Sequence, residues 1–198
     1  MPTLKEYYKN NNIFISEGNI GDNQEQKEDI ISILRDIPNA KYILEIGFNA
    51  GHSAEIFLQY SNAYLYSFDI GEHFHEYLKY GKIFINSKYP NRHTLVFGDS
   101  TITIPRFREN NNIKFDVIFI DGGHDFEIAY KDLINCRKLA NENTIVIMDD
   151  IVSDNDVGYT IGPKKAWNQL INDNLLVEIK HNDYGLGRGQ SIGIYKNL

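Results

Sequence analysis

Two groups of acidic residues follow apolar runs in this sequence and could bind a metal ion. The run "VIFI" ends on Asp121, which is followed by two glycines and His124, and the run "TIVIM" ends on Asp149 and Asp150. Carboxylate oxygens suit hard divalent ions, Mg²⁺ first and then Ca²⁺ or Mn²⁺. Three carboxylates in one small volume would repel one another unless a proton or a cation lay among them. If the two segments meet, we expect Asp121, Asp149 and Asp150 to bind a divalent ion.

His124 is the natural general base for such a site, since the unperturbed pKa of histidine is about 6.5. Gly122 and Gly123 would let the loop fold back and point His124 at a substrate. The alternative is that His124 is a surface residue or a cap at the start of a helix. In the same way, the three acids could be separate, solvated strand ends.

The stretch "LEIGFNAGHSAE" is a second candidate site. Gly47 and Gly51 would let the backbone turn tightly and approach a ligand, although they could also form a simple turn. A dinucleotide fingerprint needs glycine at the first, third and sixth positions. Counted from Gly47, the third and sixth residues are Asn49 and His52, which argues against a nicotinamide-dependent oxidoreductase.

The elements that would position these residues alternate between strands and helices. Short apolar runs rich in Ile, Val, Tyr and Phe predict buried parallel strands at 42–47, 63–70, 94–99, 115–121 and 144–150. Helical patterns are predicted at 52–61, 73–89 and 126–140. This alternation indicates an α/β fold with a doubly wound sheet, in which ligands bind at the carboxyl ends of the strands.

The two ends of the chain differ from this pattern. Residues 1–40 are predicted to form a separate N-terminal segment, with a helix over 23–37 that ends at Pro38, and this segment could be a lid over the substrate. After a helix at 162–173, the segments "LLVEIKHN" and "QSIGIYK" predict an antiparallel hairpin. Residues 41–198 would then form the main domain.

The pattern Glu-x-Gly-x-x-x-Gly-x-Ser at 45–53 resembles motif I of class I S-adenosylmethionine (SAM) methyltransferases. The version without a middle glycine is similar to the catechol and caffeoyl-CoA O-methyltransferases and to bacterial sugar O-methyltransferases of the macrocin group. The resemblance implies a Rossmann-like sheet in the order 3-2-1-4-5-7-6, with the last strand antiparallel. It covers 24–198 loosely and is most specific at 45–53, 121–124 and 149–150.

The resemblance also implies a cofactor site. In that family the glycine turn lies against the methionine part of SAM, which would involve Glu45, Gly47, Asn49, Gly51 and Ser53. Asp69 ends the second predicted strand, where an acid can accept hydrogen bonds from both ribose hydroxyls. Asp99 and Ser100 follow the third strand, where adenine is often held, and Asp121 would border the cofactor. The alternative is that Asp69 and Asp99 are helix N-caps.

The family resemblance also implies a metal site. The implied strand order places the fourth and fifth strands side by side, about 4.8 Å apart. Metal-dependent members use an acid after the fourth strand and an acidic or amide pair after the fifth, which correspond to Asp121, Asp149 and Asp150. Neighbouring strand residues point to opposite faces, so Asp149 and Asp150 can share an ion only where the strand has ended. Asp121 and His124 would be the catalytic residues.

We therefore expect a metal-dependent, SAM-dependent O-methyltransferase that acts on a small hydroxylated molecule. Metal coordination would favour the alkoxide of the acceptor and aim its oxygen at the SAM methyl group. A sugar hydroxyl is the first expectation for the acceptor and a catechol-type aromatic is the second. A non-catalytic SAM-binding subunit is the remaining alternative.

Composition limits the partners. The chain has 198 residues, a net charge of -7 and a pI of about 5.3, which disfavours nucleic acid and a methyltransferase that acts on it. No apolar run reaches the ~20 residues of a membrane span, and the start has no signal-peptide pattern. The single cysteine, Cys136, excludes a disulfide within the chain. We expect a cytoplasmic protein without a membrane partner, and a homo-oligomer stays open.

Overall fold

The central sheet follows the predicted strand order. The computed structural model describes residues 2–15, 19–72, 75–154 and 156–198, and within them seven strands form one sheet in the order β3-β2-β1-β4-β5-β7-β6. The strands are β1 (Tyr42–Ile46), β2 (Tyr64–Asp69), β3 (His93–Phe97), β4 (Phe115–Ile120), β5 (Ala140–Asp149), β6 (Leu176–Gly185) and β7 (Arg188–Tyr195). Strands β1 to β5 are parallel, and β7 is antiparallel to both β5 and β6. The predicted α/β Rossmann-like fold and the antiparallel last strand are confirmed.

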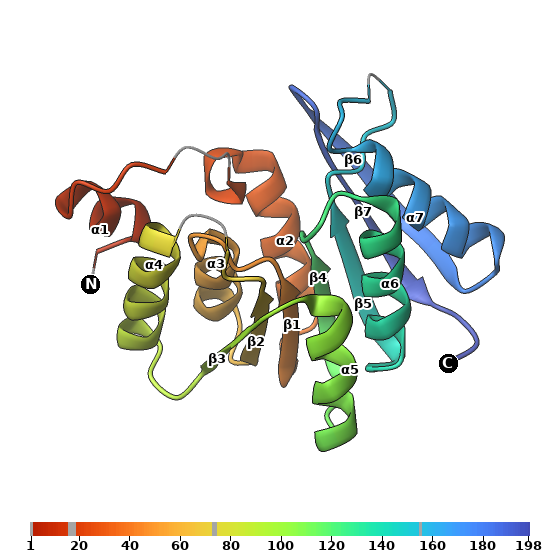
Figure 1. The fold of residues 1–198 in the computed structure, drawn as a ribbon, viewed down its shortest axis with the longest axis horizontal. Helices are drawn as coiled ribbons and strands as arrows, with labels where there is room; N and C mark the ends of the chain where they lie inside the picture. The colour runs from red at the N-terminus through yellow and green to blue at the C-terminus, as the bar shows by residue number, and fades with distance from the viewer. Residues whose placement is uncertain (1, 16–18, 73–74, 155) are drawn as a thin grey trace.

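Helices cover both faces of the sheet (Figure 1). They are α1 (Leu4–Asn10), the 3-10 helix η1 (Ile20–Asp22), α2 (Gln24–Asp36), α3 (His52–Tyr60), α4 (His75–Lys88), α5 (Ser100–Asn110), α6 (Phe126–Arg137) and α7 (Ile161–Asn172). The start of the helix predicted from residue 73 lies outside the described residues. Within those residues, every helix is too short or too polar to cross a membrane.

Successive strand residues point to opposite faces, which creates two hydrophobic cores. Ile43 and Phe119 face the core formed with α1 to α4, whereas Leu44 and Ile118 face the core formed with α5, α6 and α7. Strands β1 and β4 are therefore buried on both faces, as parallel strands between helices are.

The N-terminal segment packs on the α3 side of the sheet. Leu4 and Tyr8 are buried in the same core as the sheet residues on that side. The hydroxyl oxygen of Tyr8 lies 2.7 Å from the carbonyl oxygens of both Ala50 and Tyr77. This contact ties α1 to the glycine loop, while the role of residues 1–40 as a lid stays a prediction.

Helix α5 has no counterpart among the predicted helices. Pro105 lies inside it and the β-branched Thr101 and Ile102 lie in its first turn, so its intrinsic helix propensity is low. Its burial explains why it forms: Ile104 is fully buried, and Phe107 packs edge-on against Phe68 of β2. Tertiary packing overrides the local sequence here.

Strand β5 begins earlier than predicted. Its first residue, Ala140, pairs with Phe115 of β4, and the register then shifts before Val117 pairs with Ile145. The hydroxyl group of Thr144 bridges the irregularity by donating to the carbonyl oxygen of Phe115. The polar residues between Ala140 and Thr144 hide this strand start from a hydrophobicity pattern.

Candidate active site

The glycine loop after β1 and the acidic loop after β4 touch each other. Gly47 has a positive φ of 89°, and a Cβ atom there would lie 1.8 Å from the carbonyl oxygen of Asp121. Any other residue would force the two loops apart. Gly47 is therefore required by this close approach, and it brings the predicted cofactor loop next to the predicted metal ligand.

Asp69, at the end of β2, holds the glycine loop. Its Oδ2 accepts hydrogen bonds from the backbone N–H groups of Phe48 and Asn49, at 2.9 and 2.8 Å, and its Oδ1 accepts one from Gly71. Asn49 has a φ of 46°, in the left-handed region that asparagine tolerates better than most residues. The described residues that follow Asp69, 70–72, are not helical, so Asp69 holds a loop.

Glu45 lies beneath the loop. Its carboxylate is fully buried and accepts hydrogen bonds from the hydroxyl groups of Ser53 and Ser67. Burial raises the pKa of Glu45 to about 7, although the two hydroxyl groups oppose the shift. The hydrogen bond between Glu45 and Ser53 thus joins the end of β1 to the first turn of α3. Gly51 precedes α3, and its positive φ of 84° lets the chain turn into that helix. Their contact with a cofactor stays a prediction.

Asp99 and Ser100 lie at the start of α5. Asp99 is the N-cap of that helix, because its side chain accepts hydrogen bonds from the N–H and the hydroxyl of Thr101. The N-cap alternative is therefore confirmed for Asp99. Ser100 is the first residue of the helix. Both residues lie at the same edge of the sheet as the glycine loop, and their contact with adenine stays a prediction.

Asp121, His124 and Asp150 form a cluster that could hold a metal ion. Each offers one ligand atom, and these atoms lie within 4.8 Å of one another. The Nε2 atom of His124 is 2.8 Å from Oδ2 of Asp150. The His124 side chain is 48% exposed and that of Asp150 is 19% exposed. Two carboxylates and an imidazole are a donor set that fits a divalent cation.

Asp149 is placed differently from Asp150. Strand β5 ends at Asp149, and Asp150 then adopts a left-handed φ of 59° that carries it to His124. Oδ1 of Asp149 accepts hydrogen bonds from Nε2 of Gln26, at 2.7 Å, and from the N–H of Asp150. Burial raises the pKa of Asp149 to about 7, with a contribution from the charge of Asp150. Asp149 is not in the cluster, so its role as a ligand, through Oδ2, stays a prediction.

Tyr159, just before α7, and Gly162, in the first turn of α7, both contact the loop that carries His124. The ring of Tyr159 lies 5.8 Å from the His124 ring, edge to face, and its hydroxyl donates to the carbonyl oxygen of Gly187 in the β6–β7 turn. A Cβ atom on Gly162 would lie 2.0 Å from the carbonyl oxygen of His124. These contacts connect α7 and the β6–β7 turn to the loop that carries His124.

The sequence analysis did not identify two residues of this region, Gln26 and Tyr159. Gln26 lies on the buried stripe of α2 with Ile30 and Leu34, at a spacing of four, so a polar residue on an apolar helix face was the available signal. No comparable pattern marks Tyr159, because a loop residue gains its neighbours only through the fold.

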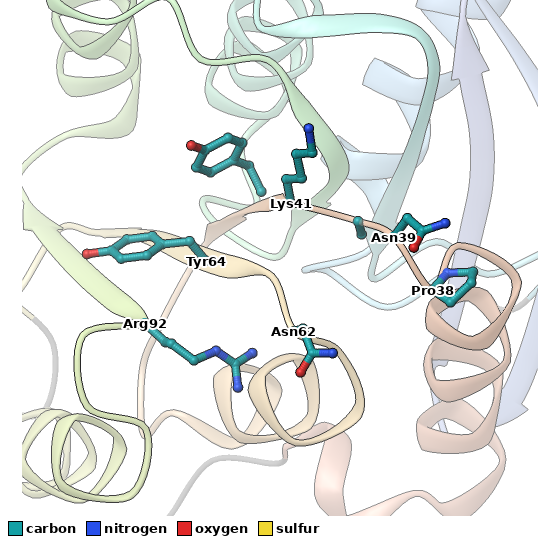
Figure 2. A pocket seen from close by; sticks show the side chains of 8 residues that line it. Pro38, Asn39, Lys41, Asn62, Tyr64 and Arg92 are labelled. Atoms are coloured by element: carbon teal, nitrogen blue, oxygen red, sulfur yellow. The ribbon is translucent and has the colours of Figure 1, made fainter.

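A second hollow lies at the opposite edge of the sheet (Figure 2). Its lining comprises Pro38, Asn39, Ala40, Lys41, Tyr42, Asn62, Tyr64 and Arg92. Tyr42 and Tyr64 are the first residues of β1 and β2, so this hollow is at the amino ends of the strands. The guanidinium group of Arg92 donates to the carbonyl oxygens of Leu58, Ser61 and Ala63. Arg92 is therefore engaged in holding the end of α3, and the acidic cluster remains the better candidate site.

Known structures share this fold along nearly the whole chain. An O-methyltransferase from Bacillus cereus in complex with SAH (S-adenosylhomocysteine) has a TM-score of 0.75 and 17% identity, and the match covers 99% of this chain and 93% of that one. The O-methyltransferase TomG from Streptomyces achromogenes, involved in tomaymycin synthesis and solved with SAM, has a TM-score of 0.72 and 15% identity, with coverages of 97% and 87%. The SAH-bound methyltransferase PaMTH1 from Podospora anserina has a TM-score of 0.72 and 18% identity, with coverages of 100% and 89%.

The similar structures show the fold, and a match to a family model shows the family. A comparison with curated proteins found no match. The model that describes a methyltransferase domain matches residues 44–151, more than half of the chain, and its range includes the glycine loop and the whole acidic cluster. The chain therefore belongs to this methyltransferase-domain family.

Proposed function

We propose that this chain transfers a methyl group from SAM to a hydroxyl group of a small molecule, with a divalent ion holding the acceptor oxygen. The observation that carries the proposal is the position of Asp121. Its carbonyl oxygen abuts Gly47 in the cofactor loop, and its carboxylate belongs to the cluster with His124 and Asp150. A methyl donor and an ion-bound acceptor would meet at this residue.

Family membership supports methyl transfer, and the similar structures support the choice of donor and acceptor atom. The Bacillus cereus and Streptomyces achromogenes proteins are O-methyltransferases with SAH and SAM bound, respectively. Asp69 supports a cofactor at the same edge of this sheet. Its Oδ2 already accepts from Phe48 and Asn49, whereas its Oδ1 accepts one backbone hydrogen bond, from Gly71, and keeps a second lone pair that a ribose hydroxyl could use.

The acidic cluster would serve the acceptor. A divalent ion, Mg²⁺ or else Ca²⁺ or Mn²⁺, supplies positive charge that favours the ionised form of an alcohol. Asp121 and Asp150 would provide oxygen ligands, and Asp149 could add Oδ2. Because Oδ2 of Asp150 faces His124, Oδ1 is the oxygen of Asp150 that remains for the ion.

His124 would accept the proton of the acceptor hydroxyl. Its Nε2 lies 2.8 Å from Oδ2 of Asp150, and an imidazole is the side chain that most readily exchanges a proton near neutral pH. SAM would supply the methyl carbon to which the acceptor oxygen would bond as the carbon–sulfur bond breaks, and SAH would be the leaving product. His124 is 48% exposed, so the proton can then pass to water.

A sugar hydroxyl, free or on a larger metabolite, is the first acceptor class that we propose. A catechol-type aromatic acceptor is the second, and one observation favours it. Tyr159 holds its ring beside His124, where it could stack on an aromatic acceptor. Methyl transfer to a matched panel of sugars and catechols would separate the two classes.

Two measurements test the proposal. Calorimetry should detect binding of SAH to the purified chain, while NAD should not bind. Methyl transfer from SAM to the hydroxyl panel should disappear on chelation with EDTA and return with added Mg²⁺. Activity that survives chelation would remove the metal from the proposal. SAH binding without turnover on any acceptor would favour a non-catalytic SAM-binding subunit.

A further inference from the structure

The turn between β6 and β7 holds an apolar residue in an unfavourable backbone conformation. Gly185 pairs with Arg188, so Leu186 and Gly187 are the two residues of a tight hairpin turn. Leu186 has a φ of 54° and Gly187 a φ of 76°. Turns with two positive φ angles favour Asn-Gly or Gly-Gly, because a bulky apolar residue rarely adopts such a φ. A leucine at this position therefore lowers the stability of the hairpin.

Leu186 gains no packing in return for this strain. It is 101% exposed, the highest value among the large hydrophobic residues that the structure describes. A single exposed leucine is common on protein surfaces, but strained backbone positions are concentrated at functional sites. The combination of strain and full exposure at one residue indicates that the Leu186 side chain has a binding role.

Two more exposed apolar side chains lie next to this turn. Val157 is 37% exposed and Tyr159 is 41% exposed. A Cβ atom on Gly187 would lie 3.0 Å from the hydroxyl oxygen of Tyr159 and 3.1 Å from Cγ2 of Val157. Figure 1 shows the β6–β7 hairpin extending beyond the ends of β4 and β5. Val157, Tyr159 and Leu186 thus form an apolar rim at the carboxyl edge of the sheet.

Hydrogen bonds fix the loops that carry the apolar rim. The buried hydroxyl group of Thr160 accepts from the N–H of Val157 and donates to its carbonyl oxygen, which closes a turn over 157–160. Just before this turn, Nζ of Lys164 donates to the carbonyl oxygen of Ser153 and to Asp156. The Tyr159 hydroxyl joins the turn to the β6–β7 hairpin. A surface that is already ordered loses little conformational entropy when a ligand binds.

The apolar rim continues from the proposed acceptor site. The Tyr159 ring lies edge to face with the ring of His124, and His124 belongs to the cluster with Asp121 and Asp150. An acceptor whose hydroxyl group lies at the cluster would therefore place its remaining atoms against the rim. A protein partner fits less well, since three side chains are far fewer than the ~20–30 residues a side of a standard protein interface.

We propose that Val157, Tyr159 and Leu186 bind an apolar part of the acceptor, so that the substrate joins a hydroxylated head group to an alkyl chain or ring system. The assignment rests on the proposed methyl transfer to a small-molecule hydroxyl. It narrows both acceptor classes, because a free sugar or a bare catechol would leave the rim uncovered. Each CH₂ group that the rim buries should tighten binding by about fourfold.

The test compares acceptors that differ only in their apolar part. One series is methyl, butyl and hexyl β-glucoside, and the other is catechol, 4-butylcatechol and 4-hexylcatechol, each with the full chain, SAM and Mg²⁺. In the series that is methylated, kcat/KM should rise at least about tenfold from the shortest to the longest member, mainly through KM. Calorimetry with SAH and Mg²⁺ should show the same rise in affinity without turnover.

Leu186→Asn is the informative variant, because it should improve the fold while it weakens the rim. Asparagine suits a positive φ, so the melting temperature should rise by about 1–4 °C. The rise in kcat/KM along the series should fall to about threefold or less. Val157→Thr should also reduce the rise. Its matched control is Val177→Thr, equally exposed but at the other end of β6, which should keep the wild-type series.

Equal affinity of wild type for the shortest and longest members would overturn the assignment, as would a rise that Leu186→Asn leaves unchanged. Wild type that forms a dimer which Leu186→Asn abolishes, with no change along the series, would assign the rim to a second copy of the chain instead. Tighter binding of the hexyl compounds without methyl transfer to any acceptor would count against the proposed function and not against the rim.

Discussion

Gln26 on α2 donates a hydrogen bond to Asp149 at the end of β5, with 2.7 Å between Nε2 and Oδ1, although 123 residues separate them in the chain. Three residues further along α2, Asp29 accepts from Lys180, Asn182 and Tyr184 of β6. Helix α2 is thus joined by polar contacts to both the end of β5 and the β6–β7 hairpin. The N-terminal region helps to position the candidate metal site.

Removal of the Gln26 amide should destabilise the protein. In Gln26→Leu, Oδ1 of the partly buried Asp149 keeps only the hydrogen bond from Asp150, and we expect the free energy of unfolding to fall by about 1–3 kcal/mol. Urea denaturation measures the change. The control is Gln24→Leu, which alters an exposed glutamine of the same helix and should stay within about 0.5 kcal/mol of wild type. Equal stability of the two variants would contradict a role for the Gln26 contact.

Gly162 is predicted to set the position of the His124 loop. In Gly162→Ala the new Cβ atom would lie 2.0 Å from the carbonyl oxygen of His124, so α7 or the loop must shift. We expect a loss of about 1–3 kcal/mol in stability together with a lower kcat. Gly158→Ala is the control, because nothing lies within 4 Å of its Cβ position. A Gly162→Ala variant with wild-type stability and kcat would show that the loop yields without cost.

His124→Gln distinguishes a general base from a metal ligand. If His124 accepts the proton, kcat should fall by about 10²–10⁴-fold while the affinities for Mg²⁺ and SAH stay near wild type. Calorimetry and initial rates measure these quantities. A large loss of Mg²⁺ affinity would instead indicate that His124 is a ligand, which its place in the cluster with Asp121 and Asp150 permits.

The buried Glu45 should make stability depend on pH. Burial raises its pKa from 4.5 to about 7, so between these values the folded chain binds more protons than the unfolded chain. The contribution of Glu45 to the free energy of unfolding is therefore present below about pH 4.5 and is lost as the pH rises toward 7, by on the order of 3 kcal/mol. In Glu45→Gln this loss should be absent.

Urea denaturation of wild type and Glu45→Gln at pH 5, 6, 7 and 8 measures the difference. Other groups that titrate in this range, such as the buried Asp132, whose pKa burial also raises to about 7, are present in both proteins and cancel. Glu45→Gln should gain stability relative to wild type from pH 5 to pH 8. A constant difference across the series would contradict the raised pKa of Glu45.

The fold could be predicted because its signals are local or shared with a family. Runs such as 117–120 and 144–148 are apolar on both faces, which only a strand between two helical layers satisfies. The order of the strands came from the resemblance at 45–53. Helix α5 escaped prediction because its stability comes from Ile104 and Phe107 in the core and not from its own propensity.

The candidate site, too, has features that the sequence determined and features that only the tertiary structure decided. The sequence by itself determined which acids follow β4 and β5, and that glycines precede α3, since these are facts of spacing along single segments. Only the tertiary structure decided that Asp150 joins Asp121 and His124 while Oδ1 of Asp149 binds Gln26. The left-handed backbone of Asp150, with a φ of 59°, turns its side chain toward His124, while the side chain of the neighbouring Asp149 points toward Gln26. Such an angle, like a partner more than a hundred residues away, depends on how all the elements pack, so no short pattern encodes it.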